Sequence, residues 1–147
     1  MREKMVGMEL VGTANALRRL AFQDGWEDRY GADSPTSMQQ WFLSYIWKHR
    51  EEKVFQKDIE AMFKIRRSTA TEILKAMERK KLIVRIPSQE DRRSKEIHLT
   101  EKAEAICREN QEKIEKTEKL IVAGMSEEEI RVLLNLLGKI QKNMKYL

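Results

Sequence analysis

The sequence predicts a mainly α-helical protein that carries one small β-hairpin, and three patterns lead to this prediction. Apolar residues recur near a 3.6-residue period through most of the 147 residues, as in amphipathic helices. Residues 82–86 form an apolar, β-branched run, and residues 95–99 alternate like its antiparallel partner. Two short helical segments directly precede this hairpin. Residues 36–99 therefore have the order of a winged helix-turn-helix, flanked by long helices within 1–31 and 100–147.

The part of the chain before this lobe is expected to form one long helix. Its apolar stripe predicts a helix over about 3–30, followed by a break. A second helix is expected over about 35–49, in which Pro35 suits the first helical position. Residues 51–55 form a short connection that could pair with the hairpin. A chain of this length is the size of one domain, 1–147.

The helix-turn-helix itself is predicted from two short amphipathic segments. The first helix is expected over about 56–63 and the second over about 66–80, with Lys64-Ile65 as the turn between them. Thr69 and Glu72 have the spacing of a capping box, so the second helix could also begin later.

Two further helices are expected after the hairpin loop, which spans 87–94. Thr100 is a good N-cap for a long helix, and Gly124 is expected to end it. Ser126 and Glu129 form a capping box that opens the last helix.

Basic residues are concentrated around the predicted helix-turn-helix and hairpin. Residues 48–95 contain 15 Lys and Arg against 8 Asp and Glu, whereas the rest of the chain contains 14 against 16. Solvated helix faces would account for any single lysine. Segregation of the charge is more typical of a surface that binds phosphate, and it favours a nucleic-acid partner.

Double-stranded DNA is the partner that this order of elements predicts. A helix fits into the major groove, and an arginine at a hairpin tip can enter a neighbouring minor groove, whose negative potential attracts it. Asp91 is predicted to support the tip by a hydrogen bond between its carboxylate and the Arg93 guanidinium. The predicted DNA contacts are the polar and basic positions of the second helix and the hairpin: Arg66, Arg67, Ser68, Thr69, Thr71, Lys75, Arg92, Arg93 and Lys95.

The flanking helices predict a homodimer. The first helix and the last two each carry an apolar stripe, and the sequence provides no sheet to cover them. Burial against the same helices of a second copy is the simplest solution. A self-contained monomeric bundle is the alternative.

Several other classes of protein are disfavoured. No apolar run approaches the roughly 18 residues that span a membrane, and the N-terminus lacks the pattern of a signal peptide. A single cysteine, Cys107, fits a reducing cytoplasm. His49 and His98 have no ligand partners at metal-site spacing, and no catalytic motif or phosphate-binding loop is present. We therefore expect a cytoplasmic protein that is not an enzyme and has no cofactor.

From about Leu10 to Met144 the chain resembles the MarR family of bacterial transcription regulators. Taken in order, the following segments carry the resemblance: Val54-Phe55-Gln56-Lys57-Asp58-Ile59, Ser68-Thr69-Ala70-Thr71, Leu82-Ile83, Asp91-Arg92-Arg93-Ser94-Lys95 and Leu99-Thr100-Glu101-Lys102-Ala103. The wing pattern of the family is matched at Asp91, Arg93, Leu99 and Thr100. The chain departs from the family at two positions. Lys81 stands where Gly is usual, and Lys64 stands where Gly or Asn is usual.

The resemblance implies a homodimer that binds a pseudo-palindromic operator and usually represses transcription. In many such proteins a small phenolic or anionic effector releases the DNA. The family's effector region corresponds here to aromatic residues that could equally be ordinary core residues: Trp26, Tyr30, Trp41, Phe42 and Tyr45. Other members respond to thiol oxidation, but Cys107 lies on an apolar helical stripe, where a buried, inert thiol is the expected state.

Two alternatives to an effector-controlled repressor remain. One is a DNA-binding protein that needs no ligand. The other is a winged-helix module that binds proteins and never contacts DNA. Such a module would not need four arginines together on the recognition helix and the wing, namely Arg66, Arg67, Arg92 and Arg93.

Overall fold

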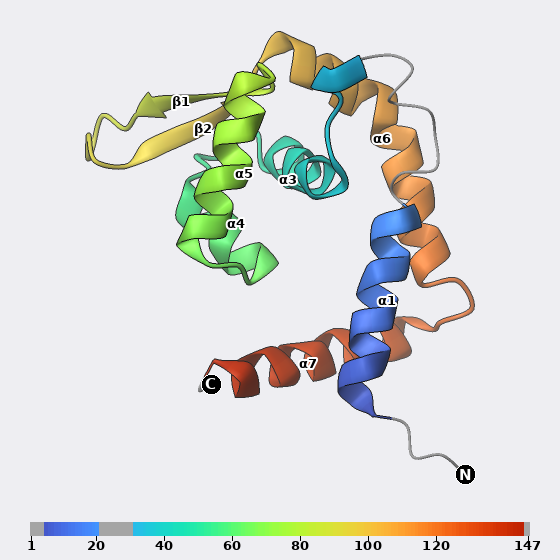
Figure 1. The fold of residues 1–147 in the computed structure, drawn as a ribbon. Coiled ribbons are helices and arrows are strands. Elements are labelled where there is room, and N and C mark those ends of the chain that lie inside the picture. The colour runs from blue at the N-terminus through green and yellow to red at the C-terminus, as the bar shows by residue number, and fades with distance from the viewer. Residues whose placement is uncertain (1–4, 21–30, 146–147) are drawn as a thin grey trace. The chain divides into compact units, whose positions relative to one another are not determined.

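The computed structural model describes residues 5–20 and 31–145, which belong to two compact units, 1–111 and 112–147. Each unit is described here by itself. The described elements are α1 (Val6–Leu20), η1 (Gly31–Asp33), α3 (Ser37–Lys48), α4 (Gln56–Phe63), α5 (Arg67–Arg79), β1 (Ile83–Pro87), β2 (Lys95–Leu99), α6 (Glu101–Ile121) and α7 (Glu127–Met144) (Figure 1).

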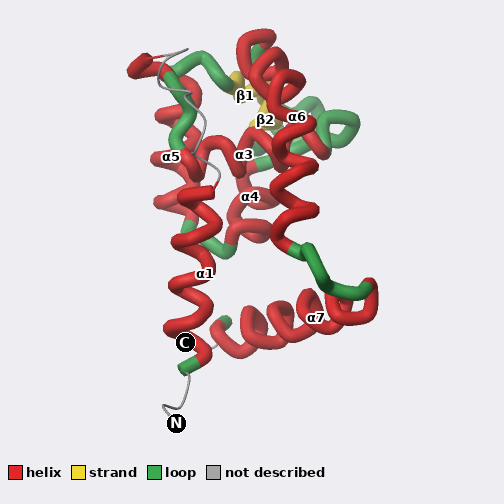
Figure 2. Tube along the Cα trace, turned by 90° about the vertical axis from the view of Figure 1, so that its right-hand side faces the viewer, coloured by secondary structure: helices red, strands yellow, loops and turns green. Residues whose placement is uncertain are grey.

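The predicted winged helix-turn-helix is confirmed. Helix α4 has the predicted bounds, and α5 begins at Arg67, which excludes the later start at a Thr69 capping box. Strands β1 and β2 pair antiparallel from Ile83↔Leu99 to Pro87↔Lys95. Phe55 adds a single bridge to Glu96, so the connection before α4 does pair with the hairpin. Figures 1 and 2 show α4, α5 and the hairpin as neighbours from two directions, in agreement with their contacts.

One apolar core holds the elements of this lobe together. Its members come from the inner faces of α3, α4, α5, the hairpin and the first turns of α6, and from the segments just before α4 and β1. They are Phe42, Leu43, Ile46, Val54, Ile59, Leu74, Met77, Leu82, Ile83, Ile97, Ala103, Ile106 and Cys107, each at most 4% exposed. Because the core fills the side of α5 away from solvent, the opposite side of this helix stays free to meet a partner.

The start of α3 differs from the prediction. Pro35 does not occupy the first helical position, because the N-cap is Thr36 and the helix begins at Ser37. The Thr36 hydroxyl accepts a hydrogen bond from the Gln39 amide, and the Gln39 side chain accepts one from the Thr36 amide. This capping box satisfies helix-end donors that a proline could not.

Both departures from the family pattern adopt a left-handed backbone. Lys64 ends α4 with φ of 53°, and Lys81 follows α5 with φ of 59°. After α5, the Leu82 amide donates to the Met77 carbonyl oxygen and the Lys81 amide to that of Glu78, which is a Schellman motif. A side chain disfavours this conformation by about 1 kcal/mol relative to glycine. The motif therefore forms here in spite of the lysine at its centre.

Thr100 joins the end of α5 to the start of α6. Its hydroxyl accepts from the Ala103 amide, as predicted for an N-cap, and donates to the Lys81 carbonyl oxygen at 2.6 Å. The left-handed turn at Lys81 is therefore stabilised both by the hydrogen bonds of the Schellman motif and by the hydroxyl of Thr100.

In the second unit, α7 opens with the predicted capping box. The Glu129 amide donates to the Ser126 hydroxyl, and the Ser126 amide donates to the Glu129 carboxylate. A turn containing Gly124, with φ of 80°, separates α6 from α7.

No residue of α7 is buried, and none of α1 either. Of the predicted first helix, residues 6–20 are helical, and 3–4 and 21–30 lie outside the described residues.

Candidate nucleic-acid interface

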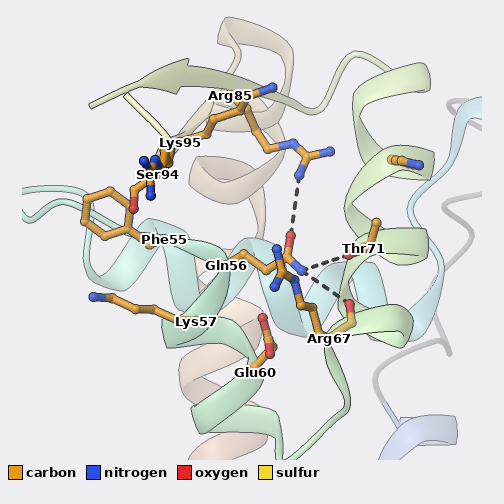
Figure 3. Close-up of a pocket in the computed structure, with 11 residues that line it drawn as sticks. Phe55, Gln56, Lys57, Glu60, Arg67, Thr71, Arg85, Ser94 and Lys95 are labelled. Carbon is orange, nitrogen blue, oxygen red and sulfur yellow. Dashed lines mark hydrogen bonds between the residues drawn. The ribbon is translucent and has the colours of Figure 1, made fainter. Parts of the chain in front are cut away.

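A hollow of about 530 Å³ lies between α4, α5 and the hairpin. Figure 3 shows side chains from all three parts pointing into it. Its lining combines residues that are up to 40 positions apart in the chain: Phe55, Gln56, Lys57, Glu60, Arg67, Thr71, Lys75, Arg85, Arg93, Ser94 and Lys95.

The lining of this hollow is strongly basic. Six of its side chains are lysine or arginine, and Glu60 is its one carboxylate. Cations from separate elements that face a common space add their fields there. The hollow is therefore suited to a polyanion and unsuited to an apolar ligand.

The structure brings together five of the nine residues predicted to contact DNA. Arg67, Thr71 and Lys75 face the hollow from α5, and Arg93 and Lys95 face it from the hairpin. The other four residues lie outside the lining. Three of them are exposed at the start of α5, and the fourth is at the hairpin tip, where it borders a separate hollow: Arg66, Ser68, Thr69 and Arg92.

Asp91 supports the hairpin tip, but through a different donor from the predicted one. Its carboxylate accepts a hydrogen bond from the backbone amide of Arg93 at 3.0 Å, rather than from the guanidinium. Its carbonyl oxygen also accepts from the Ser94 amide at 3.0 Å. An aspartate commonly bonds the backbone two residues on, and this local turn leaves the Arg93 side chain directed into the hollow.

Two residues of the hollow have structural roles that the sequence analysis did not assign. Gln56 donates from Nε2 to the Thr71 hydroxyl at 2.9 Å and to the Arg67 carbonyl oxygen at 3.3 Å. Arg85 donates to the Gln56 Oε1 at 3.4 Å and from Nε to Glu78 at 2.8 Å. In the sequence, the one sign of these roles was the arginine within an apolar strand, because a charged side chain in such a place is usually paired.

The five aromatic residues considered for an effector region have different surroundings. Trp26 and Tyr30 lie outside the described residues. Phe42 is a core residue, 0% exposed, with its ring centroid 4.9 Å from that of Phe63. Trp41 and Tyr45 are half-buried on α3. Burial raises the pKa of Tyr45, and nearby carboxylates add to the rise, so its phenol stays protonated at neutral pH.

Cys107 is a buried thiol, as expected. Burial, with a smaller contribution from the charge of Glu104, raises its pKa to about 12. The thiolate is the reactive form, and almost none of it exists at neutral pH. Its sulfur lies 3.9 Å from the Leu43 carbonyl oxygen, to which the thiol can donate.

Within residues 5–20 and 31–145 there is no group of three or more His, Cys, Asp or Glu side chains arranged to hold a metal. In the same part of the chain, no helix combines the length and apolar character needed to cross a bilayer.

A helix-turn-helix with a hairpin wing and a basic hollow between them defines the class of winged helix-turn-helix proteins. The sequence profile of the MarR family matches residues 36–94, which include α3, α4, α5 and β1. The resemblance to this family that the sequence motifs predicted is thus confirmed.

Solved structures of the family resemble nearly the whole chain. The transcription regulator MarR from Oenococcus oeni PSU-1 is 27% identical, with a TM-score of 0.80 over 94% of this chain and 99% of that one. A MepR–DNA complex from S. aureus is 24% identical, with a TM-score of 0.75 over 97% and 99% of the two chains. A putative MarR family regulator from Listeria monocytogenes, complexed with 26mer DNA, is 22% identical, with a TM-score of 0.75 over 97% and 90%.

Proposed function

We propose that the protein is a sequence-specific, DNA-binding transcription regulator that acts as a homodimeric repressor. The observation that carries the proposal is the hollow in which six cations from α4, α5 and the hairpin face one space with a single carboxylate. DNA offers a continuous row of phosphates to such a surface. Two structural relatives have been solved as DNA complexes. Because its proposed partner is chromosomal, we place the protein in the cytoplasm.

In this proposal α5 enters the major groove and the hairpin follows the DNA backbone toward a minor groove. Helix α5 presents an exposed polar face, since its apolar positions Ala70, Leu74 and Met77 are fully buried. Selection of duplexes from a random library tests the proposal directly. Recovery of one preferred motif supports it, and recovery of none contradicts it.

Replacing Arg67 or Thr71 by alanine is expected to lower operator affinity by about 1–3 kcal/mol if the side chain contacts a base. Preference should also relax at one operator position. Binding titrations on the selected operator and on single-base variants measure both effects. Arg67→Lys is the matched control, because lysine keeps the charge but lacks the planar fork of arginine. A loss that is equal on all duplexes would reassign the residue to phosphate contact.

The dimer part of the proposal rests on apolar side chains that a single chain leaves uncovered. In α1, Met8 is 70% and Val11 is 62% exposed. Leu120 near the end of α6 is 61% exposed, and Leu134 in α7 is 63% exposed. Each of these helices carries an apolar stripe, and burial of such stripes is the main source of helix stability in water. A second copy would supply the same stripes in a two-fold arrangement.

The protein is therefore expected to sediment as a dimer at micromolar concentration and to select an operator with two half-sites. The half-site centres should lie about 10 base pairs apart, or one helical turn, because the two recognition helices meet the same side of the duplex. Analytical ultracentrifugation measures the mass, and the library selection measures the spacing. A folded monomer with a single, undivided recognition site would contradict this expectation.

Release by a small phenolic or anionic effector completes the proposal. It is supported by the match to the MarR family profile and by the half-buried aromatic residues Trp41 and Tyr45 on α3. A DNA-binding protein without an effector is the alternative within the same class. Operator titrations with a panel of small phenols and carboxylates separate the two, since only the first requires a compound that weakens binding.

A further inference from the structure

Four side chains form a hydrogen-bonded chain that begins and ends on α5. Arg85 of β1 donates to Glu78 of α5, with its Nε 2.8 Å from the carboxylate oxygen. The same guanidinium donates to the amide oxygen of Gln56 at 3.4 Å, and the Gln56 amide nitrogen lies 2.9 Å from the hydroxyl of Thr71. Figure 3 shows Gln56 between Arg85 and Thr71. We call these four residues the Gln56 relay.

The direction of every hydrogen bond in the Gln56 relay follows from its charged end. A carboxylate only accepts and a guanidinium only donates, so Arg85 must donate to both Glu78 and Gln56. The Gln56 oxygen is thereby held toward Arg85, and its NH₂ group must face Thr71. The second hydrogen of this NH₂ group goes to the Arg67 carbonyl oxygen at 3.3 Å, which holds the amide in place.

The Gln56 relay leaves the hydroxyl hydrogen of Thr71 unused. Its oxygen accepts from Gln56, so the hydroxyl hydrogen is not used in this contact. Thr71 is half-buried and lines the basic hollow, with its hydroxyl at the boundary between α4 and α5. A ligand that reaches this hydroxyl therefore meets its hydrogen and one remaining lone pair.

We infer that Gln56 is a specificity-determining, positioning residue, held by the relay so that the hydroxyl hydrogen of Thr71 stays available to DNA. The inference rests on the proposed function, in which α5 lies in the major groove. An available hydroxyl hydrogen can be donated to base atoms that only accept, which are N7 and O6 of guanine, N7 of adenine and O4 of thymine. If that hydrogen were used within the protein, Thr71 could only accept, as from the amino groups of adenine and cytosine. Gln56 thus affects which bases Thr71 prefers, although it does not contact a base itself.

Gln56→Glu tests this inference because it reverses the last bond of the relay. A carboxylate at position 56 still accepts from Arg85, but it cannot donate, so Thr71 must donate to it. The lone pairs of the hydroxyl would then face the DNA. At one position of each half-site, we expect the ratio of affinities for an accepting base edge and an amino edge to shift toward the amino edge. The expected shift is roughly two- to tenfold, the contribution of one hydrogen bond. Library selection finds the position, and titration of matched operator pairs measures the ratio.

Three variants separate this effect from charge and from folding. Lys57→Gln changes the net charge by the same amount at the neighbouring position, and it should weaken all operators alike without a shift in preference. Gln56→Met removes the hydrogen bonds of residue 56 at nearly constant volume but leaves the Thr71 hydroxyl hydrogen available, so it should produce no shift toward the amino edge. In a Thr71→Val background, Gln56→Glu should produce no shift, because valine keeps the shape but lacks the hydroxyl.

The outcomes also distinguish this inference from the proposed function. If the parent selects no DNA motif, the proposed function is wrong. If the parent selects a motif and Gln56→Glu keeps the same base preference, the relay does not determine whether Thr71 can donate to DNA. A shift that persists in the Thr71→Val background would likewise overturn the inference, because another side chain would then carry it.

Discussion

Arg93→Ala is expected to lower operator affinity by about 1–3 kcal/mol, or roughly five- to 150-fold. Arg93 is exposed at the hairpin tip and lines the basic hollow, so its guanidinium can reach a minor groove next to the major groove that α5 occupies. A narrow A·T-rich minor groove concentrates negative potential and favours arginine there. Anisotropy titrations at fixed salt on an operator with A·T or G·C flanks measure the effect, which should be larger for the A·T flanks.

Arg92→Ala is the matched control for this change. Arg92 borders a different hollow, with Pro87, Ser88 and Gln89, and we expect it to contact phosphate. Its loss should weaken all duplexes alike and reduce the slope of log K against log salt concentration by about 0.9, the value for one phosphate contact. If Arg93→Ala behaves in the same way as Arg92→Ala, the minor-groove role of Arg93 is wrong.

Asp91→Ala should also weaken binding, although it removes a negative charge near the phosphates. The reason is the hydrogen bond from the Arg93 amide to the Asp91 carboxylate, which holds the turn at the tip. Asp91→Asn is the sharper comparison, because an asparagine oxygen can accept the same bond without the charge. We expect the asparagine variant to bind at least as tightly as the parent. Tighter binding by the alanine variant would show that charge outweighs the turn.

Phe42→Ala is expected to lower the free energy of unfolding by about 3–5 kcal/mol, the range for a fully buried phenylalanine. Its side chain is 0% exposed and packs on Phe63 at the centre of the lobe, so alanine leaves a cavity that the surrounding helices fill only in part. Urea unfolding followed by circular dichroism measures the change, with both proteins at the same concentration because a dimer gains stability from association.

Met62→Ala is the control for this measurement. Met62 lies on α4 close to Phe63 in sequence but is 58% exposed, so its loss should change stability by less than about 0.5 kcal/mol. A loss below about 1 kcal/mol for Phe42→Ala would contradict the core position of this ring. It would agree better with a side chain that lines an opening for an effector.

The order of the helices and the bounds of α4 could be predicted because they depend on residues close together in the chain. Ala70, Leu74 and Met77 recur at helical spacing, and all three are buried in α5. The capping box of Ser126 and Glu129 joins residues three positions apart, and it too was predicted. The same holds for the exposed arginines at the start of α5, because a helix that buries one face must expose the other.

The predictions that failed depended on a choice between neighbouring groups. Pro35 was placed at the first position of α3, but Thr36 and Gln39 together cap the helix better. Asp91 was paired with the Arg93 guanidinium, but the backbone amide of the same residue is held in place by the turn and costs less entropy to engage. For Asp91, residue spacing identified Arg93 as the partner, but it did not decide whether the guanidinium or the backbone amide donates the hydrogen bond.

The arrangement of the basic hollow depends on residues that meet only when the chain is folded. Gln56 and Thr71 are 15 positions apart, and Gln56 and Arg85 are 29 apart. No helical or strand period connects them, and the contact exists because β1 and α4 both pack against α5 around one core. Local patterns therefore predicted the recognition helix and its charges, whereas the hydrogen-bonding direction at Thr71 follows from how the packed elements bring Glu78, Arg85 and Gln56 into a single chain of donors and acceptors.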